Sequence, residues 1–387
     1  MLAHYFGGWS DAIHWGAMEP RIRITPLGDV HIDQSFVKTV YEPFGRVGGT
    51  AQVTQAIDAY DQLYSPMTER PSFAELVEPE FLKAWESEFG ISLDHTRDFV
   101  DDLETLGTKP ARPIIEISRS DLVQTLASIA AIDESKASAA LSRFALMPRP
   151  KWRVVGDSWS DKDWFPWRFR RRLSLIRKPL LQIEPGDDAT LVVAPGLFRE
   201  SFQAIVHWFY RGQIPQGQAR SSEMSKWIGH ANNVQRSKFN MTVADRMREL
   251  GWQAEPELKL TKIFGRSFDR DYGDIDVLAW RPENGRVLAM ECKDLHYLKT
   301  LGEVAEQLND FRGSLRPNGK PDHLKRHLDR LEILRANEEP LALALRLTPP
   351  IRIEGQLVFK NPVPMQFAWN LTASSIKLSI FSNLDQL

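Results

Sequence analysis

The sequence predicts an α/β protein whose C-terminal domain holds a mixed sheet flanked by helices. Two short apolar runs near residue 280 alternate with the strand period of two, and amphipathic helical patterns precede and follow them. Upstream segments with helical spacing predict a mainly helical N-terminal region, followed by a strand-containing middle region. Together these patterns define the fold class.

Composition supports a globular chain of two or three domains, since 387 residues with 42% hydrophobic side chains can bury an ample core. The formal net charge of −2 gives no global attraction to nucleic acid, so any such site must be local. The single cysteine excludes an internal disulfide framework and a cysteine-based zinc site. No apolar run approaches the ~20 residues of a membrane span. We therefore expect a cytoplasmic protein with no membrane association.

Residues 1–147 are predicted to form the mainly helical region, for which the sequence suggests no role. Apolar residues recur at helical spacing in four segments, at Thr50–Tyr64, Ser72–Phe89, Thr96–Leu106 and Ser120–Leu146. Ser120 and Ser135 are the expected N-caps in the last segment. The Pro-containing cluster that begins at Met147 predicts the first domain boundary.

Residues 148–222 differ in character, with predicted strands and many basic and aromatic side chains. Trp167 lies beside four arginines, Arg168, Arg170, Arg171 and Arg172. Cations for phosphates and rings for base stacking suit a single-stranded or distorted nucleic acid. A solvent-facing strand above buried tryptophans explains the same pattern, and both interpretations stay open. A polar linker at 211–222 predicts the second boundary.

Residues 223–387 contain a predicted β-hairpin, from Tyr272 to Asp294. Alternation puts Asp274 and Asp276 on one face of its first strand. Glu291 and Lys293 share a face of its second strand, and Cys292 points the other way. The flanking helices are predicted at Ser237–Leu250, Thr300–Phe311 and Asp322–Ala336. The other strands are predicted at Glu257–Phe264, Ile351–Phe359 and Ile376–Phe381.

Charged residues are rarely left at the edge of a core unless something pairs them. A hard divalent cation is one such partner, because Mg²⁺ prefers carboxylate and water oxygens and keeps positions open for a phosphate. A neighbouring lysine could activate water or neutralise charge that builds on a phosphate. The pattern therefore favours metal-dependent phosphodiester hydrolysis over a solvated surface ion pair.

The hairpin resembles the PD-(D/E)XK nuclease superfamily, which has a restriction-endonuclease-like fold. Asp276 is followed 15 residues later (291 − 276 = 15) by Glu291-x-Lys293, within segments GDIDVLA and ECK that are similar to Mrr-type and Holliday-junction-resolvase-like branches. The resemblance implies hydrolysis of DNA with Mg²⁺ or Mn²⁺. It implies Asp276 and Glu291 as metal ligands, the Cys292 carbonyl as a third and Asp274 as a secondary one. Lys293 would position the attacking water.

The resemblance also identifies supporting residues and one departure. Asn240 stands where these branches often have an acidic residue, so it can orient a water or ligate through its carbonyl but brings no charge. Gln307 is similar to the glutamine of a Gln-x-x-x-Tyr element, although Phe311 replaces the tyrosine. It could hydrogen-bond the lysine or a phosphate, or be an ordinary exposed helix residue.

The alternative function is a catalytically inactive nuclease-fold subunit that binds nucleic acid or assembles a larger complex, which Asn240 favours. The basic segment Asp322–Ala336 could line a nucleic-acid groove or be a solvated helix. Nucleic acid, expected to be DNA, is the predicted partner. A homodimer and assembly with other subunits both stay open. A role in restriction or phage defence follows from the habits of the resembled family.

Overall fold

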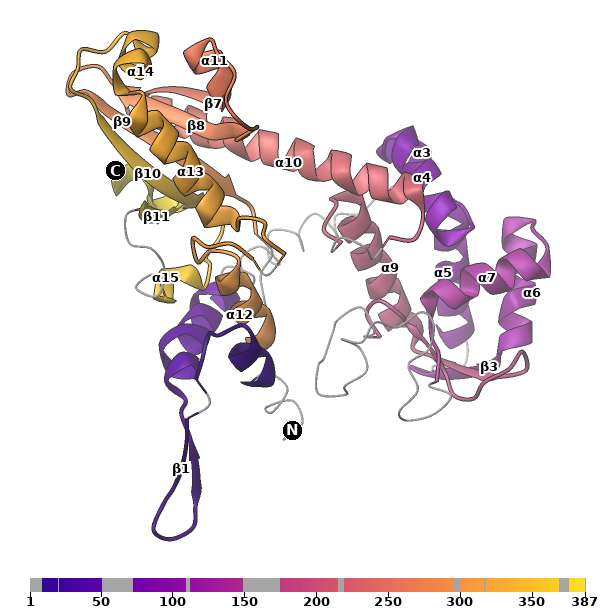
Figure 1. Cartoon of the computed structure of the whole chain (residues 1–387). Helices are drawn as coiled ribbons and strands as arrows, with labels where there is room; N and C mark the ends of the chain where they lie inside the picture. The colour runs from indigo at the N-terminus through magenta and orange to yellow at the C-terminus, as the bar shows by residue number, and fades with distance from the viewer. Residues whose placement is uncertain are drawn as a thin grey trace. The chain divides into compact units, whose positions relative to one another are not determined.

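The computed structural model describes residues 9–19, 21–50, 72–108, 112–148, 175–214, 219–295, 300–316, 318–368 and 376–386 (Figure 1). The described part is mixed α/β and contains three sheets, which confirms the predicted class. The chain divides into two compact units, one of residues 66–233 and one of residues 1–65 with 234–387.

This division differs from the predicted boundaries at 147 and 222. The first 65 residues belong with the C-terminal sheet, because Phe36, Val40 and Phe44 are buried in the same apolar core as that sheet. The helical region and the middle strands share a second core instead, in which Phe144 and Leu180 both lie. Contacts distant in sequence therefore set the boundaries, and composition shifts along the chain do not reveal them.

The unit of residues 66–233 combines helices with a four-stranded sheet. Its helices are α3 (Phe73–Leu76), α4 (Pro79–Phe89), α5 (Leu93–Thr108), α6 (Arg119–Ala130), α7 (Glu134–Phe144) and α9 (Pro195–Tyr210). Its strands, in sheet order, are β3 (Ile115–Ser118), β6 (Thr190–Val193), β5 (Leu180–Gln182) and β4 (Ala145–Leu146). Trp85 stacks on Phe89 at a centroid distance of 4.1 Å, at the centre of an aromatic-rich core.

Two of the predicted helices in this unit are each divided in two. The chain is extended at Val77 and Glu78 before α4 begins at Pro79, since proline lacks an N–H and suits the first helical turn. The later segment divides at Ala131, a left-handed residue that ends α6. Its N-caps are Ser118 and Asp133, so the predicted caps at Ser120 and Ser135 were wrong by two residues each.

The other unit is built on a five-stranded mixed sheet. Its strands are β7 (Gln253–Lys259), β8 (Asp274–Arg281), β9 (Arg286–Lys293), β10 (Arg352–Phe359) and β11 (Ile376–Ile380), in the spatial order β11-β10-β9-β8-β7. β7, β8 and β9 pair antiparallel, whereas β9, β10 and β11 pair parallel. The predicted hairpin is β8–β9, with alternating residues directed to opposite faces.

Helices cover both faces of this sheet (Figure 1). Helix α10 (Ser222–Glu249) packs Phe239, Val243 and Met247 on one face, against alternate residues of β8 and β9. The opposite face carries α12 (Leu301–Asn309), α13 (His323–Ala336) and α14 (Glu338–Leu345). The sheet strands β7, β8 and β9 thus follow α10, and β10 and β11 follow α12–α14, in the order expected from the sequence.

The predicted strand Glu257–Phe264 was only partly right. β7 ends at Lys259, and the rest forms the short helix α11 (Leu260–Phe264). Leu260, Ile263 and Phe264 have helical spacing and pack against the core, so burial of this face decides the conformation.

The remaining elements are short. They are the hairpin β1 (Ile22–Ile24) and β2 (Val30–Ile32), the π-helical turn η1 (Val37–Tyr41), helix α15 (Met365–Ala368) and the final turn η4 (Phe381–Gln386). Among the described residues, none of the helices has the length and apolarity that a bilayer crossing requires.

Candidate active site

Three charged side chains lie together on one face of the β8–β9 hairpin. The pairing of Val277 with Met290 brings Asp276 and Glu291 to neighbouring positions on the two strands, and each keeps only 3% of its surface exposed. Lys293 follows two residues after Glu291 on the same face. The structure thus brings these three predicted residues together.

The two carboxylates converge on one cation, the ammonium group of Lys293. Lys293 Nζ lies 2.6 Å from Glu291 Oε1 and 3.8 Å from Asp276 Oδ2. Asp276 Oδ2 also accepts a hydrogen bond of 2.9 Å from the backbone N–H of Cys292. The Cys292 side chain packs in the α10 core on the other face, as predicted. One oxygen of Asp276 is thus held by the backbone, close to the shared lysine.

Helix α13 adds two further side chains to this cluster. Arg330 Nη1 donates to Glu291 Oε2, and Arg330 Nε donates to the Tyr272 carbonyl oxygen at 3.0 Å. His327 is 1% exposed, and its Nδ1 lies 4.0 Å from the same Glu291 oxygen. Both oxygens of Glu291 therefore contact a cationic group.

The site face of α13 corrects the prediction of a solvated basic helix. Lys325 is part-exposed, but His327 and Arg330 are buried against the sheet. The sequence did contain a signal, because His323, His327 and Arg330 have the i, i+4, i+7 spacing of a single helix face. That face joins the carboxylates because apolar neighbours such as Leu331 anchor the helix in the core.

The electrostatics of the cluster follow from burial and close charges. Burial, together with the negative charge of Glu291, raises the pKa of Asp276 to about 6. Burial opposes ionisation of Glu291 too, but Lys293 and Arg330 outweigh it and hold its pKa below the ordinary value. The pKa of Lys293 is raised because the two carboxylates outweigh the opposing effect of burial.

Two histidines of α13 remain neutral near pH 7. Burial lowers the pKa of His327 to about 4, and the positive charge of Arg330 adds to the shift. Burial and the charge of Lys293 lower the pKa of His323 to about 4 as well. Neutral imidazoles leave Arg330 and Lys293 as the charges that balance Asp276 and Glu291.

The carboxylate pair offers the oxygen donors that a hard divalent cation prefers. Asp276 and Glu291 already share one cationic group, the ammonium of Lys293. Within the described ranges, no three His, Cys, Asp or Glu side chains gather as a group able to hold a metal ion. A divalent cation at this position would therefore have two side-chain ligands, Asp276 and Glu291, and would need water or phosphate oxygens to complete its coordination.

The other predicted residues lie farther from this cluster or are not described. Asp274 is the first residue of β8, half-buried and on the same face as Asp276. Gln307 lies on α12, and its Oε1 is buried without a hydrogen-bond partner among the described residues. The basic and aromatic set Trp167, Arg168, Arg170, Arg171 and Arg172 falls outside the described residues.

Asn240 lies on α10, and its one described hydrogen bond is to Glu257 rather than to the carboxylate cluster. It is fully buried, and its Nδ2 donates to Glu257 Oε1 at 3.3 Å. Glu257 lies in β7 with a φ of +54°, between two residues that pair with Val277 and Ile275 on either side of Asp276. Sequence reasoning did not single out Glu257, because nothing in the sequence marks its left-handed backbone.

The described structure thus defines a mixed α/β protein with a buried cluster of two carboxylates, a lysine and an arginine. Residues 1–384 match the family described as "Anti-phage protein Upx-like". Since the match spans nearly the whole chain, the protein belongs to the Upx-like family of anti-phage proteins. This confirms the expected role in phage defence. Comparison with curated proteins found no match, and comparison with solved structures found none either.

Proposed function

We propose that the protein is a metal-dependent nuclease of the PD-(D/E)XK type, which hydrolyses phosphodiester bonds of DNA in phage defence. The observation that carries this proposal is the convergence of Asp276 and Glu291 on the ammonium group of Lys293. Further support comes from the sheet, because the hairpin lies between a helix on one face and helices on the other.

Each side chain has a role that its contacts make chemically reasonable. Asp276 and Glu291 would hold Mg²⁺ or Mn²⁺ through carboxylate oxygens, with Asp276 kept in place by the Cys292 N–H. The bound ion would act as a Lewis acid on the phosphate and lower the pKa of a bound water. Lys293 would orient that water and offset charge that develops on the phosphate. The low exposure of the carboxylates strengthens these charge interactions.

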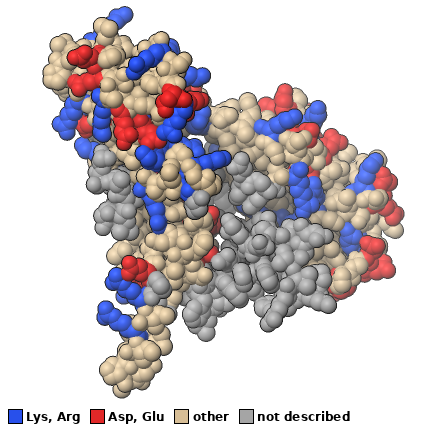
Figure 2. All heavy atoms as spheres, in the orientation of Figure 1, with Lys and Arg blue, Asp and Glu red and all other residues tan. Residues whose placement is uncertain are grey.

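Local charge, and not the field of the whole chain, would have to attract DNA. Basic and acidic side chains are interspersed on the face drawn in Figure 2, in keeping with a net charge of −2. The arginines between residues 168 and 172 are the proposed nucleic-acid contacts. Phosphate contacts of this kind make binding weaker as salt rises.

The decisive experiment compares cleavage by the wild type with cleavage by site variants. Purified protein is incubated with plasmid, linear and single-stranded DNA and with RNA, in Mg²⁺, Mn²⁺ or EDTA. We expect metal-dependent cleavage by the wild type and its loss in Glu291→Ala and Lys293→Ala. Glu249→Ala is the matched control, since this glutamate at the end of α10 is 64% exposed and pairs only with Arg246 among the described ion pairs. Absence of cleavage by the folded wild type on every substrate would overturn the proposal.

A second candidate is a nuclease-fold subunit that binds nucleic acid or assembles a complex without cleaving. One observation favours it: both oxygens of Glu291 contact cationic side chains, Lys293 and Arg330, so the protein balances this charge itself. In this case DNA would bind with equal affinity to the wild type and to Glu291→Ala, and neither would cleave it. Fluorescence anisotropy with labelled DNA, run in parallel with the cleavage assay, separates the two functions.

A further inference from the structure

Arg330 connects the two strands that carry the carboxylates. Its Nη1 reaches Glu291 on β9, while its Nε reaches the carbonyl of Tyr272, two residues before β8 begins at Asp274. One guanidinium group thereby ties α13 to β9 and to the segment that leads into β8. The planar fork of arginine suits this task, because two of its N–H groups can serve separate acceptors at once.

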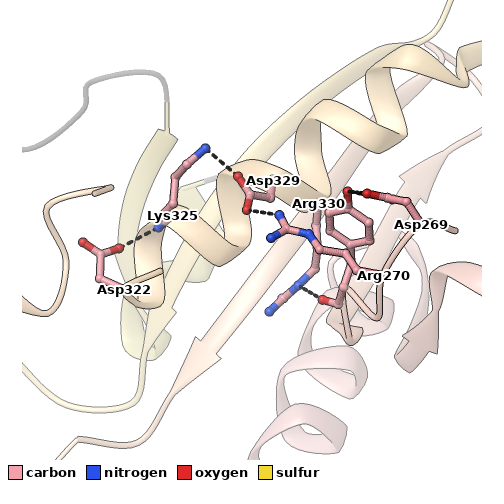
Figure 3. Close-up of polar contacts among 7 residues, drawn as sticks. Asp269, Arg270, Asp322, Lys325, Asp329 and Arg330 are labelled. Carbon is pink, nitrogen blue, oxygen red and sulfur yellow. Dashed lines mark hydrogen bonds and ion pairs between the residues drawn. The ribbon is translucent and has the colours of Figure 1, made fainter. Parts of the chain in front are cut away.

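A second set of contacts holds α13 against the loop that leads into β8 (Figure 3). Asp329, next to Arg330 on the helix, accepts from Arg270 at 2.8 Å and from Lys325 at 2.5 Å. The hydroxyl of Tyr272 donates to Asp269 in the same loop at 3.0 Å. The helix, the loop and the start of β8 are therefore joined through neighbouring residues of α13.

Arg330 and Glu291 are both buried, so loss of either partner is energetically costly. The side chain of Arg330 is 10% exposed and that of Glu291 is 4% exposed, so neither charge can recover its hydration if the other is removed. Because Arg330 engages Oε2 of Glu291, the other oxygen, Oε1, is left to contact Lys293, which also lies near Asp276. The contact with Arg330 therefore determines which oxygen of Glu291 faces the ammonium group of Lys293.

We infer that Arg330 is a positioning residue for the proposed metal site. It fixes Glu291 so that this residue binds the metal ion through a single carboxylate oxygen, and it holds the start of β8 in register with Glu291. The inference rests on the proposed function, since it assigns Arg330 a part in that same site. A purely structural ion pair would affect folding alone. A positioning residue affects cation affinity in a protein that stays folded.

The test measures Mn²⁺ binding to the full chain without nucleic acid, by electron paramagnetic resonance of free Mn²⁺, together with DNA cleavage and thermal unfolding. We expect Arg330→Gln to weaken Mn²⁺ binding and cleavage by about 10- to 100-fold, the usual effect of losing a partner of a metal ligand. The Mn²⁺ affinity and cleavage activity of Arg330→Lys should lie between those of the wild type and those of Arg330→Gln. A lysine ammonium lacks the planar arrangement of N–H groups that lets arginine contact Glu291 and Tyr272 together. Arg335→Gln is the control, since this exposed α13 arginine contacts only the Ile353 carbonyl among the described hydrogen bonds.

Rescue with added guanidinium ion distinguishes positioning from folding. We expect guanidinium at millimolar concentration to restore part of the Mn²⁺ affinity of Arg330→Ala, and the similarly sized urea to restore none. Folded Arg330→Gln and Arg330→Lys variants with wild-type Mn²⁺ affinity would overturn the inference while leaving the proposed function intact. A wild type that binds Mn²⁺ but cleaves nothing would overturn the nuclease activity alone, and the variants would still decide the role of Arg330. A wild type that binds no Mn²⁺ would overturn both.

Discussion

Glu291 shows how much a single side chain depends on its surroundings. It is buried beside Lys293 and Arg330, and the charges of these two side chains hold its pKa below the ordinary value despite burial. A carboxylate in this position is therefore ionised, and it balances two positive charges that have little access to water. Removing its charge leaves Arg330 without its described carboxylate partner, while Lys293 keeps only the longer contact with Asp276.

Glu291→Gln is expected to lower the free energy of unfolding by about 3 kcal/mol, the typical cost of leaving the partner of a buried ion pair without its counter-charge. Urea denaturation at pH 7 in EDTA measures this change. Glu249→Gln is the control, because its carboxylate is 64% exposed and should shift stability very little. Equal stability of Glu291→Gln and the wild type would contradict the ion-pair network described for α13 and β9.

The raised pKa of Asp276 predicts how the stability of the protein changes with pH. Its pKa rises from an ordinary 3.8 to about 6 in the folded protein, because of burial and the nearby charge of Glu291. Between about pH 4 and pH 6 the folded state thus holds a proton that the unfolded state has released. The contribution of Asp276 to stability therefore decreases as pH rises through this window.

Asp276→Asn should remove the decrease in folding stability that occurs as pH rises from about 4 to about 6. In EDTA we expect the variant to be more stable than the wild type at pH 7, with the difference vanishing below about pH 4. The side-chain oxygen of asparagine can still accept the Cys292 N–H, so the hydrogen bond survives. Thermal unfolding across pH 4 to 8 measures the difference in stability between Asp276→Asn and the wild type. A stabilisation of the variant that becomes larger toward low pH would contradict the prediction.

At the scale of elements, the N-terminus of α13 determines how firmly the site face of this helix is held. Asp322, 1% exposed, accepts from Lys325 N at 2.7 Å and from Ser314 N at 3.0 Å. It caps the helix that carries His327 and Arg330. Loss of the cap would expose buried N–H groups and loosen the helix at the end nearest to the preceding loop.

Asp322→Ala is expected to destabilise the protein by about 2 kcal/mol, the upper range for a cap, because the side chain also satisfies a second N–H. It should weaken cleavage as well, since α13 positions Arg330. Asp133→Ala is the matched control: Asp133 caps α7 through Lys136 N at 2.8 Å in the other unit. We expect this control to lose stability without losing Mn²⁺ affinity, as measured by denaturation and Mn²⁺ titration.

At the scale of the whole molecule, the first 65 residues complete the core beneath the sheet. Phe36, Val40 and Phe44 are buried with residues of β8, β9 and α12. A fragment of residues 223–387, the domain predicted from the sequence, would therefore expose apolar surface normally covered by this segment. Burial of three such side chains is worth several kcal/mol.

Fragment 223–387 is accordingly expected to lack a cooperative unfolding transition, whereas fragment 66–233, which contains its own core, should unfold cooperatively. Supplying residues 1–65 as a separate chain should restore structure to the first fragment. Calorimetry and circular dichroism measure these transitions. A stable, cooperative 223–387 fragment would show that the N-terminal segment is dispensable for this core.

The sequence by itself determined the fold class, the β8–β9 hairpin and the grouping of Asp276, Glu291 and Lys293. Strand alternation is a local property with a period of two, so neighbouring residues suffice to assign each side chain to a face. Helical and strand periodicity also located α12, α13, β10 and β11 within a few residues. It misplaced the end of β7, where burial of Leu260 and Phe264 favours a helix.

Only the tertiary structure decided which distant elements complete the site. Arg330 lies 39 residues after Glu291 and pairs with it only because the apolar face of α13 packs on the sheet. The N-terminal segment joins the C-terminal unit for the same reason, since buried apolar surface is not directional and leaves no local mark in the sequence. Local periodicity therefore predicted the acidic pair and its lysine, and long-range packing supplied the arginine that holds them.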